Sequence, residues 1–237
     1  MTTTAYDLHF IASDIAFTDN NDEVHLDIPF RKVKRIDNIV FGMAGCLRCM
    51  NDYCKTIIDF LENKIDNVNL PKSIIDRSDS DFIVMLYING ACLKLEKRKN
   101  SGLFIENITQ VPVVIGSGGN YVQDILNDCP NAVVAVLEAI KRDKYTKGDV
   151  KYCSIRREDI HNLEVSPMST VKLQVFGIQQ EVEAANDFLN KKENQGKVFS
   201  ASTEVFQHGN PSPISIEVGM AMIKEGFSNI KNKLSEV

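Results

Sequence analysis

The chain has 237 residues, enough for one large domain or for one domain with an appendage. Hydrophobic residues make up 43 % and charged residues 25 %, which is ordinary for a soluble globular protein. The formal net charge of −5 argues against nucleic acid as a partner. No apolar run approaches the roughly 18 residues of a membrane span, and the first residues lack the features of a signal peptide. We therefore expect a cytoplasmic protein that binds neither nucleic acid nor membrane.

Strands dominate the predictions for the first part of the chain. Asp14 interrupts an apolar run and needs a cationic partner, because an unpaired buried charge is costly. Asn89-Gly90 is the type I′ turn signal of a hairpin. Helices are predicted where apolar side chains recur at helical spacing. The expected strands are 9–17, 24–28, 31–36, 39–43, 82–95 (the hairpin), 102–108, 111–115 and 149–156, and the expected helices are 47–65, 121–126 and 132–141.

The character of the sequence changes after about residue 165. Residues 171–178 and 197–206 are predicted to be strands, and residues 179–192 and 215–234 to be helices. We expect one domain over residues 1–160. Residues 161–237 would form a C-terminal α/β extension that packs on it or serves in assembly. The element order favours an α+β fold, with antiparallel sheets packed against helices.

Six cysteines in a chain without an export signal are typical of reduced thiols. Cys46-Leu-Arg-Cys49 is a CxxC, which could bind a metal ion or do redox chemistry. A single CxxC with no second pair of ligands is poor support for a zinc site, so we favour buried thiols at the start of a packed helix. We expect no metal site and no cofactor.

The first residues offer a nucleophile. Removal of Met1 would leave Thr2 with a free α-amino group, whose pKa is about 8 before any shift by the fold. That amine can act as general base for the hydroxyl of the same residue, so nucleophile and base arrive together.

Six short motifs follow one another in the order of a known family. They resemble the proteasome β-subunit and its bacterial relative, the proteasome-like ATP-dependent peptidase, which are N-terminal nucleophile hydrolases. The resemblance runs from Thr2 to about Ile155 and implies a four-layer αββα sandwich of two mainly antiparallel sheets. The motifs are Thr2-Thr-Thr4, Ala12-Ser-Asp14 with Ile15-Ala-Phe-Thr18 after it, Lys32-Val33, Phe41-Gly-Met-Ala-Gly45, Ile115-Gly-Ser-Gly-Gly119 and Arg142-Asp-Lys-Tyr-Thr-Lys-Gly148.

The resemblance implies a threonine endopeptidase. Thr2 would be the nucleophile, Asp14 and Lys32 would set the electric field around it, and the Gly45 N–H would bind the oxyanion. The α-amino group, or a water beside it, would be held by Ser117, Asp143 and Thr146. Thr18 would hold the substrate backbone, and Met43 would line the side-chain pocket. The implied partners are a peptide or unfolded protein as substrate, further copies in a homo-oligomeric ring and a possible ATP-dependent unfoldase.

The pattern departs from the family in two places. Only eleven residues separate Thr2 from Asp14, where the family has a longer hairpin. A symmetric shortening would leave Thr2 opposite Asp14, with the turn near 6–8, whereas a loss from the start of the strand would leave no nucleophile. Lys144 and Lys147 stand where the family has Ser and Gly. Two hypotheses therefore remain, a hydrolase and a catalytically inactive scaffold or interaction protein, with a small-amide hydrolase as a weaker third.

Overall fold

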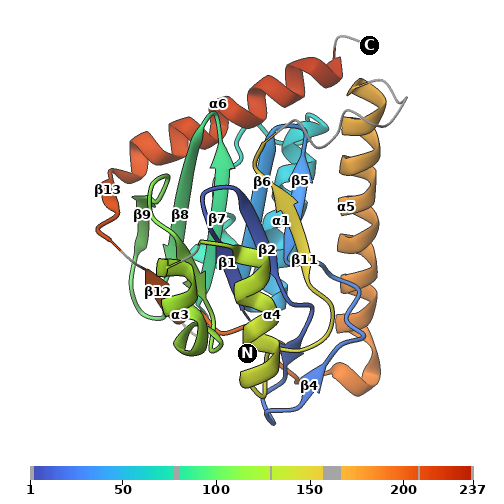
Figure 1. Cartoon of the computed structure of the whole chain (residues 1–237). Coiled ribbons are helices and arrows are strands. Elements are labelled where there is room, and N and C mark those ends of the chain that lie inside the picture. The colour runs from blue at the N-terminus through green and yellow to red at the C-terminus, as the bar shows by residue number, and fades with distance from the viewer. Residues whose placement is uncertain (1–2, 77–80, 129, 157–166, 208, 236–237) are drawn as a thin grey trace.

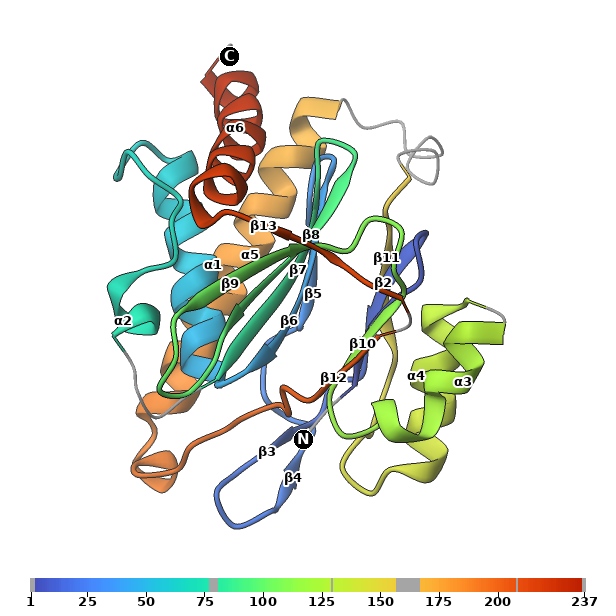
Figure 2. The same cartoon turned by 90° about the vertical axis from the view of Figure 1, so that its left-hand side faces the viewer.

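The computed structural model describes residues 3–76, 81–128, 130–156, 167–207 and 209–235. Two antiparallel sheets lie face to face in this part of the chain, and helices lie on the outer side of each (Figure 1; Figure 2). The expectation of a mixed fold with antiparallel sheets is confirmed. No described helix combines the length and the apolar character that crossing a membrane requires.

The first sheet has five strands in the order β11-β2-β1-β10-β12. The β1–β2 hairpin pairs Thr4 with Ser13 and Tyr6 with Ile11, which corrects the expected register by one residue. Thr3, and not Thr2, lies across from Asp14, since Asp14 N donates to Thr3 O at 3.2 Å. The strands are β1 (Thr4–Tyr6), β2 (Phe10–Ser13), β10 (Val113–Ile115), β11 (Lys151–Ser154) and β12 (Val205–Gln207).

The side chain of Asp7 accounts for this register. Its Oδ1 accepts hydrogen bonds from the backbone N–H of His9 at 2.8 Å and of Phe10 at 2.6 Å. Leu8 takes a positive φ of 79°, as a tight turn at this point requires. The turn is therefore centred on Leu8 and His9, later in the chain than the expected turn near 6–8.

The second sheet has six strands in the order β13-β9-β8-β7-β6-β5. Its β7–β8 hairpin turns at Asn89 and Gly90, whose φ values of 50° and 83° confirm the predicted type I′ turn. The strands are β5 (Val33–Ile36), β6 (Ile39–Gly45), β7 (Phe82–Ile88), β8 (Ala91–Lys97), β9 (Leu103–Asn107) and β13 (Ser212–Ile214). A separate two-stranded sheet joins β3 (Phe17–Thr18) to β4 (Val24–His25).

Helices divide between the two outer faces (Figure 2). On the side of the six-stranded sheet lie α1 (Leu47–Leu61), α2 (Lys72–Ile75), α5 (Pro167–Asn190) and α6 (Ile216–Ser235). On the side of the five-stranded sheet lie α3 (Gly119–Asp128) and α4 (Ala132–Arg142). A short 3₁₀ helix at Lys192–Asn194 follows α5. A large apolar core includes side chains of both sheets together with α1, α5 and α6, and a smaller one lies under α3 and α4.

The expected strand at residues 171–178 is wrong, because these residues lie within α5. Val171, Leu173 and Val175 alternate with other residues, which gives a strand-like period. In the structure Leu173 is 62 % exposed, whereas Val171 and Ile178 are buried two helical turns apart. The buried face continues at helical spacing through Val182, Ala185 and Phe188. The helical period of the buried side chains therefore determines the structure, and not the strand-like alternation. Of the expected strand at 197–206, only its end belongs to a strand, β12.

The last part of the described chain contributes to both sheets and to the core. Strand β12 pairs with β10 at one edge, and β13 pairs with β9 at an edge of the other sheet. Helix α6 buries Ile223, Phe227 and Ile230 completely. These contacts make the C-terminal elements part of the packing that holds the sheets.

Truncating Phe227 to alanine should destabilise the whole fold. The ring is fully buried in the core, so its loss should cost roughly 3–5 kcal/mol in the free energy of unfolding. Chemical denaturation followed by circular dichroism measures this cost. The matched control is Val218→Ala on the same helix, where the side chain is 53 % exposed and the change should cost less than about 0.5 kcal/mol. Equal effects of the two changes would show that α6 does not share the core.

Candidate functional site

A buried ion pair joins the ends of two strands from different sheets. Asp14 directly follows β2, and Lys32 directly precedes β5. Lys32 Nζ lies 2.8 Å from Asp14 Oδ1, and both side chains are fully buried. Lys32 Nζ also donates to Ala16 O at 2.5 Å and lies 4.8 Å from the centre of the Phe17 ring. The sequence expectation that Asp14 needs a cationic partner is met by Lys32.

The surroundings shift the proton affinity of this lysine. Burial lowers the pKa of the Lys32 ammonium below its ordinary value, and the Asp14 carboxylate opposes that shift. Asp14 receives three further hydrogen bonds from backbone N–H groups: Thr3 at 3.1 Å on Oδ1, and Ala16 at 3.3 Å and Lys147 at 3.2 Å on Oδ2. Such donors stabilise the ionised carboxylate. Hydrogen bonds from the surrounding backbone therefore hold the ion pair in place.

A second group of polar side chains surrounds the hydroxyl of Thr3, the residue just before β1. Thr3 Oγ1 lies 2.8 Å from Thr146 Oγ1 and donates to it, because the single Thr146 proton is given to Asp143. Thr146 Oγ1 donates to Asp143 Oδ2 at 2.6 Å, and Ser117 Oγ donates to the same oxygen at 2.5 Å. Gly118 makes the approach possible, since a Cβ there would lie 2.1 Å from Thr3 Oγ1. The structure thus brings Ser117, Asp143 and Thr146 together at the start of β1.

Gly45 lies at the end of β6, where α1 begins. Its φ is +114°, and a Cβ there would lie 2.3 Å from Asp81 O, so the position requires glycine. Met43 N donates to Lys32 O at 3.0 Å. Because backbone groups two residues apart point to the same side of a strand, the Gly45 N–H points toward the side on which Lys32 lies.

Thr18 and Met43 are both buried, and neither position is an open binding surface as the chain stands. Met43 is fully buried, and its carbonyl accepts a hydrogen bond from Thr4 Oγ1 at 3.3 Å. Thr18 exchanges two backbone hydrogen bonds with Ser200, at 2.9 and 2.8 Å. The segment around Ser200 continues to Gly45, whose carbonyl accepts from Ala201 N at 2.8 Å. The chain's own residues 199–201 therefore run between Thr18 and Gly45.

Sequence reasoning missed two participants, Thr3 and Ser200. Thr3 stood within the Thr2-Thr-Thr4 motif, but its place opposite Asp14 follows from the turn at Asp7, which no motif specifies. Ser200 lies in a stretch with no catalytic signal. The predicted nucleophile, Thr2, lies outside the described residues, so its role stays a prediction.

A separate cavity of about 720 Å³ lies between α5 and β5. Arg31, Lys34 and Glu181 line it, and both cations pair with the Glu181 carboxylate. The candidate site residues named above do not line it.

Removing the buried cation should destabilise the fold. Lys32→Ala leaves the Asp14 carboxylate buried without its ammonium, at a cost of roughly 3–5 kcal/mol in the free energy of unfolding. Denaturant titration measures it. Lys144→Ala, at an exposed position of the same motif region, is the control and should change little. The double variant Lys32→Met with Asp14→Asn removes both charges and should regain part of the loss; a double variant that is less stable than Lys32→Ala would contradict this account of the pair.

Comparisons with known proteins do not assign this chain to a family. No protein-family model matches the chain, and no curated protein matches it. Among solved structures, the chain is similar to a Gly-1 mutant of Anbu from Hyphomicrobium sp. strain MC1. The two share 11 % identity at a TM-score of 0.41, and the match covers 82 % of this chain and 96 % of the Anbu chain. A likeness at this TM-score carries no argument, so the interpretation below rests on the residues themselves.

Proposed function

We propose that this chain is a proteasome-like N-terminal nucleophile hydrolase that cleaves amide or peptide bonds, with Thr2 as nucleophile once Met1 is removed. One observation carries the proposal. Residues far apart in the sequence meet around Thr3, the neighbour of the proposed nucleophile: Asp14, Lys32, Ser117, Asp143 and Thr146. The two sheets between helices would then be the four-layer αββα sandwich of that family.

Strand geometry supports the side on which the nucleophile would act. Thr4 begins β1, two residues after the proposed nucleophile. Thr4 faces β6, since its Oγ1 donates to Met43 O and its methyl would lie 3.0 Å from a Cβ at Gly42. Lys32 and Gly45 lie toward this side of the sheet. We propose that the Thr2 hydroxyl acts on this side, where the cation and the proposed oxyanion donor lie.

The proposed reaction proceeds in two steps. The Thr2 hydroxyl attacks the amide carbonyl carbon, and its proton passes to the Thr2 amine. The Gly45 N–H donates to the oxyanion that forms, while Lys32 stabilises the developing charge on the hydroxyl oxygen. The protonated amine gives its proton to the leaving nitrogen, and an ester on Thr2 remains. Water then hydrolyses this ester, with the amine as base, and restores the hydroxyl.

The inactive scaffold remains the second candidate, and two observations favour it. Thr3, and not Thr2, lies across from Asp14. The backbone of Thr18, expected to hold substrate, already pairs with Ser200. An enzyme with this geometry must displace residues 199–201 when substrate binds. A scaffold needs no such displacement.

For the active protein we propose a peptide or an unfolded protein as substrate, a homo-oligomeric ring as the assembly and an ATP-dependent unfoldase as a partner. Exposed apolar side chains lie on α3 and α4 at one outer face and on α5 at the other, and we propose these faces as assembly surfaces. These side chains are Tyr121, Val134, Leu137, Leu173 and Phe176, each between 43 and 62 % exposed.

Thr2→Ala should abolish hydrolysis, because it removes the nucleophilic hydroxyl, and should leave the fold intact, because the only other group lost is one methyl. The test uses a peptide epoxyketone, which reacts with both the hydroxyl and the free amine of an N-terminal threonine. Intact mass first establishes that the chain begins at Thr2, and then whether one adduct forms. Thr56→Ala on α1, remote from the site, is the control and should label as the unchanged protein does. No adduct on a chain that begins at Thr2 would leave the scaffold as the better account.

Loosening the segment at Ser200 should accelerate labelling. Ser200→Pro removes the N–H that donates to Thr18 O, at a cost of about 1 kcal/mol, which corresponds to roughly fivefold in rate if the segment must leave first. Labelling kinetics with the same epoxyketone measure the change, and Ser202→Pro is the neighbouring control. Slower labelling of Ser200→Pro, with the fold retained, would contradict displacement of this segment.

A further inference from the structure

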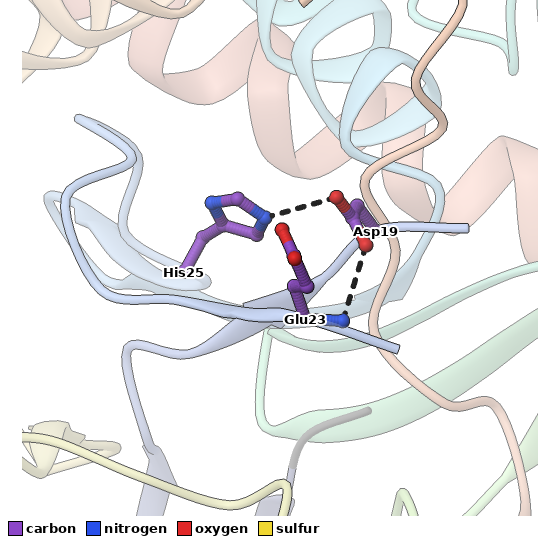
Figure 3. A group of neighbouring side chains, drawn as sticks. All are labelled: Asp19, Glu23 and His25. Carbon is purple, nitrogen blue, oxygen red and sulfur yellow. Dashed lines mark hydrogen bonds and ion pairs between the residues drawn. The ribbon is translucent and has the colours of Figure 1, made fainter. Parts of the chain in front are cut away.

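Three side chains of metal-binding type converge at the β3–β4 hairpin, outside the proposed catalytic residues. They are Asp19, Glu23 and His25, and Figure 3 shows them around one point of the hairpin. One ligand atom from each lies within 4.8 Å of the others. Asp19 is buried, His25 is partly buried and Glu23 is exposed, so the group is reachable from solvent on the Glu23 side.

Backbone hydrogen bonds fix the Asp19 carboxylate. Its Oδ1 accepts from Asn21 N at 2.9 Å and from Glu23 N at 3.1 Å. Burial raises the pKa of Asp19, but these two N–H donors and His25 outweigh it, and the pKa is lower than its ordinary value. The Asp19 side chain is 0 % exposed. One oxygen is therefore used by the turn, and Oδ2 points toward His25.

Two buried atoms of the group face each other. Asp19 Oδ2 and His25 Nε2 lie 3.2 Å apart, which is an ion-pair contact when the imidazole is protonated (Figure 3). Neither atom has a hydrogen bond of good geometry from any other described residue. When Nε2 of a neutral imidazole carries the lone pair, both atoms are acceptors, and a cation between them would satisfy both.

Their separation fits a shared metal ion. Two oxygen or nitrogen ligands at about 2.0–2.1 Å from one ion lie about 2.9–3.4 Å apart, for octahedral to tetrahedral angles. The observed 3.2 Å falls in this range. The Glu23 carboxylate is close enough to supply a third ligand, and water would complete the shell.

Lys197 is the competing cation. Its Nζ lies 3.6 Å from Asp19 Oδ2, beyond hydrogen-bond distance, and its side chain is 30 % exposed. The lysine can therefore swing into solvent when an ion binds. His25 also packs edge-on against Phe199, with ring centres 5.1 Å apart, which orients the imidazole.

We propose that Asp19, Glu23 and His25 bind a divalent transition-metal ion of the Zn²⁺ type. The imidazole nitrogen favours such an ion over Mg²⁺ or Ca²⁺, which prefer oxygen ligands alone. The site is structural: it fixes the turn of the hairpin that carries Thr18. It takes no part in the proposed hydrolysis and does not depend on it.

The test is calorimetric titration of the full-length protein, freed of metal by a chelator, with ZnCl₂. We expect one equivalent of Zn²⁺ to bind, and MgCl₂ to bind at least about tenfold more weakly. His25→Ala should weaken Zn²⁺ binding by at least about tenfold. His9→Ala, an exposed histidine elsewhere, is the matched control and should bind as the unchanged protein does. Lys197→Gln should tighten binding, because it removes the competing charge.

Thermal unfolding gives a second readout. Zn²⁺ should raise the midpoint of the unchanged protein and of His9→Ala, but not of His25→Ala. If His25→Ala fails to fold, Glu23→Gln replaces it, since this exposed side chain can be changed without disturbing the core. Absence of Zn²⁺ binding to the unchanged protein would overturn the proposal. Equal binding by the ligand variant and the control would also overturn it, because the ion would then sit elsewhere, for example on the cysteines.

Discussion

The buried ion pair between Lys32 and Asp14 is the constraint on which the centre of the molecule depends. Asp14 directly follows a strand of the five-stranded sheet and Lys32 directly precedes a strand of the six-stranded sheet, so the pair fixes both sheets at one point. The Asp14 carboxylate also receives backbone donors from Thr3 and from Lys147, which draws β1 and the loop before β11 to the same place. Desolvating two charges is costly, and the hydrogen bonds that Asp14 accepts from backbone N–H groups and that Lys32 donates to Ala16 O offset part of that cost.

Much of this arrangement could be predicted where a local rule determines the structure. Asn89-Gly90 specified its hairpin, because only residues that tolerate positive φ fit a type I′ turn. Asp14, Lys32, Ser117, Asp143 and Thr146 were singled out by motif, and the structure brings them together because each lies at a strand end or in a loop that the sheets place at one edge.

The features that the sequence did not predict depend on contacts between residues distant in sequence, or on a choice between helical and strand periodicity. Residues 171–178 fit a strand as well as a helix, and only the apolar face of α1 and β5 decides for the helix. The register of the first hairpin is set by the Asp7 side chain, and a one-residue shift changes which threonine faces Asp14. Asp19 and Glu23 stand six and two residues before His25, a spacing that matches no metal-binding motif, and only the folded hairpin brings the three side chains together.

The edge positions of β12 and β13 have a consequence for biosynthesis. Each strand completes a different sheet, and both come from residues 205–214, which the ribosome makes after almost everything they pair with. Until they emerge, β10 and β9 present unpaired backbone edges, which are the surfaces through which strands of separate chains associate. A stalled or truncated nascent chain would therefore expose two unpaired strand edges at once, and both could pair with other chains. We expect such nascent chains to rely on chaperones for as long as those edges stay uncovered.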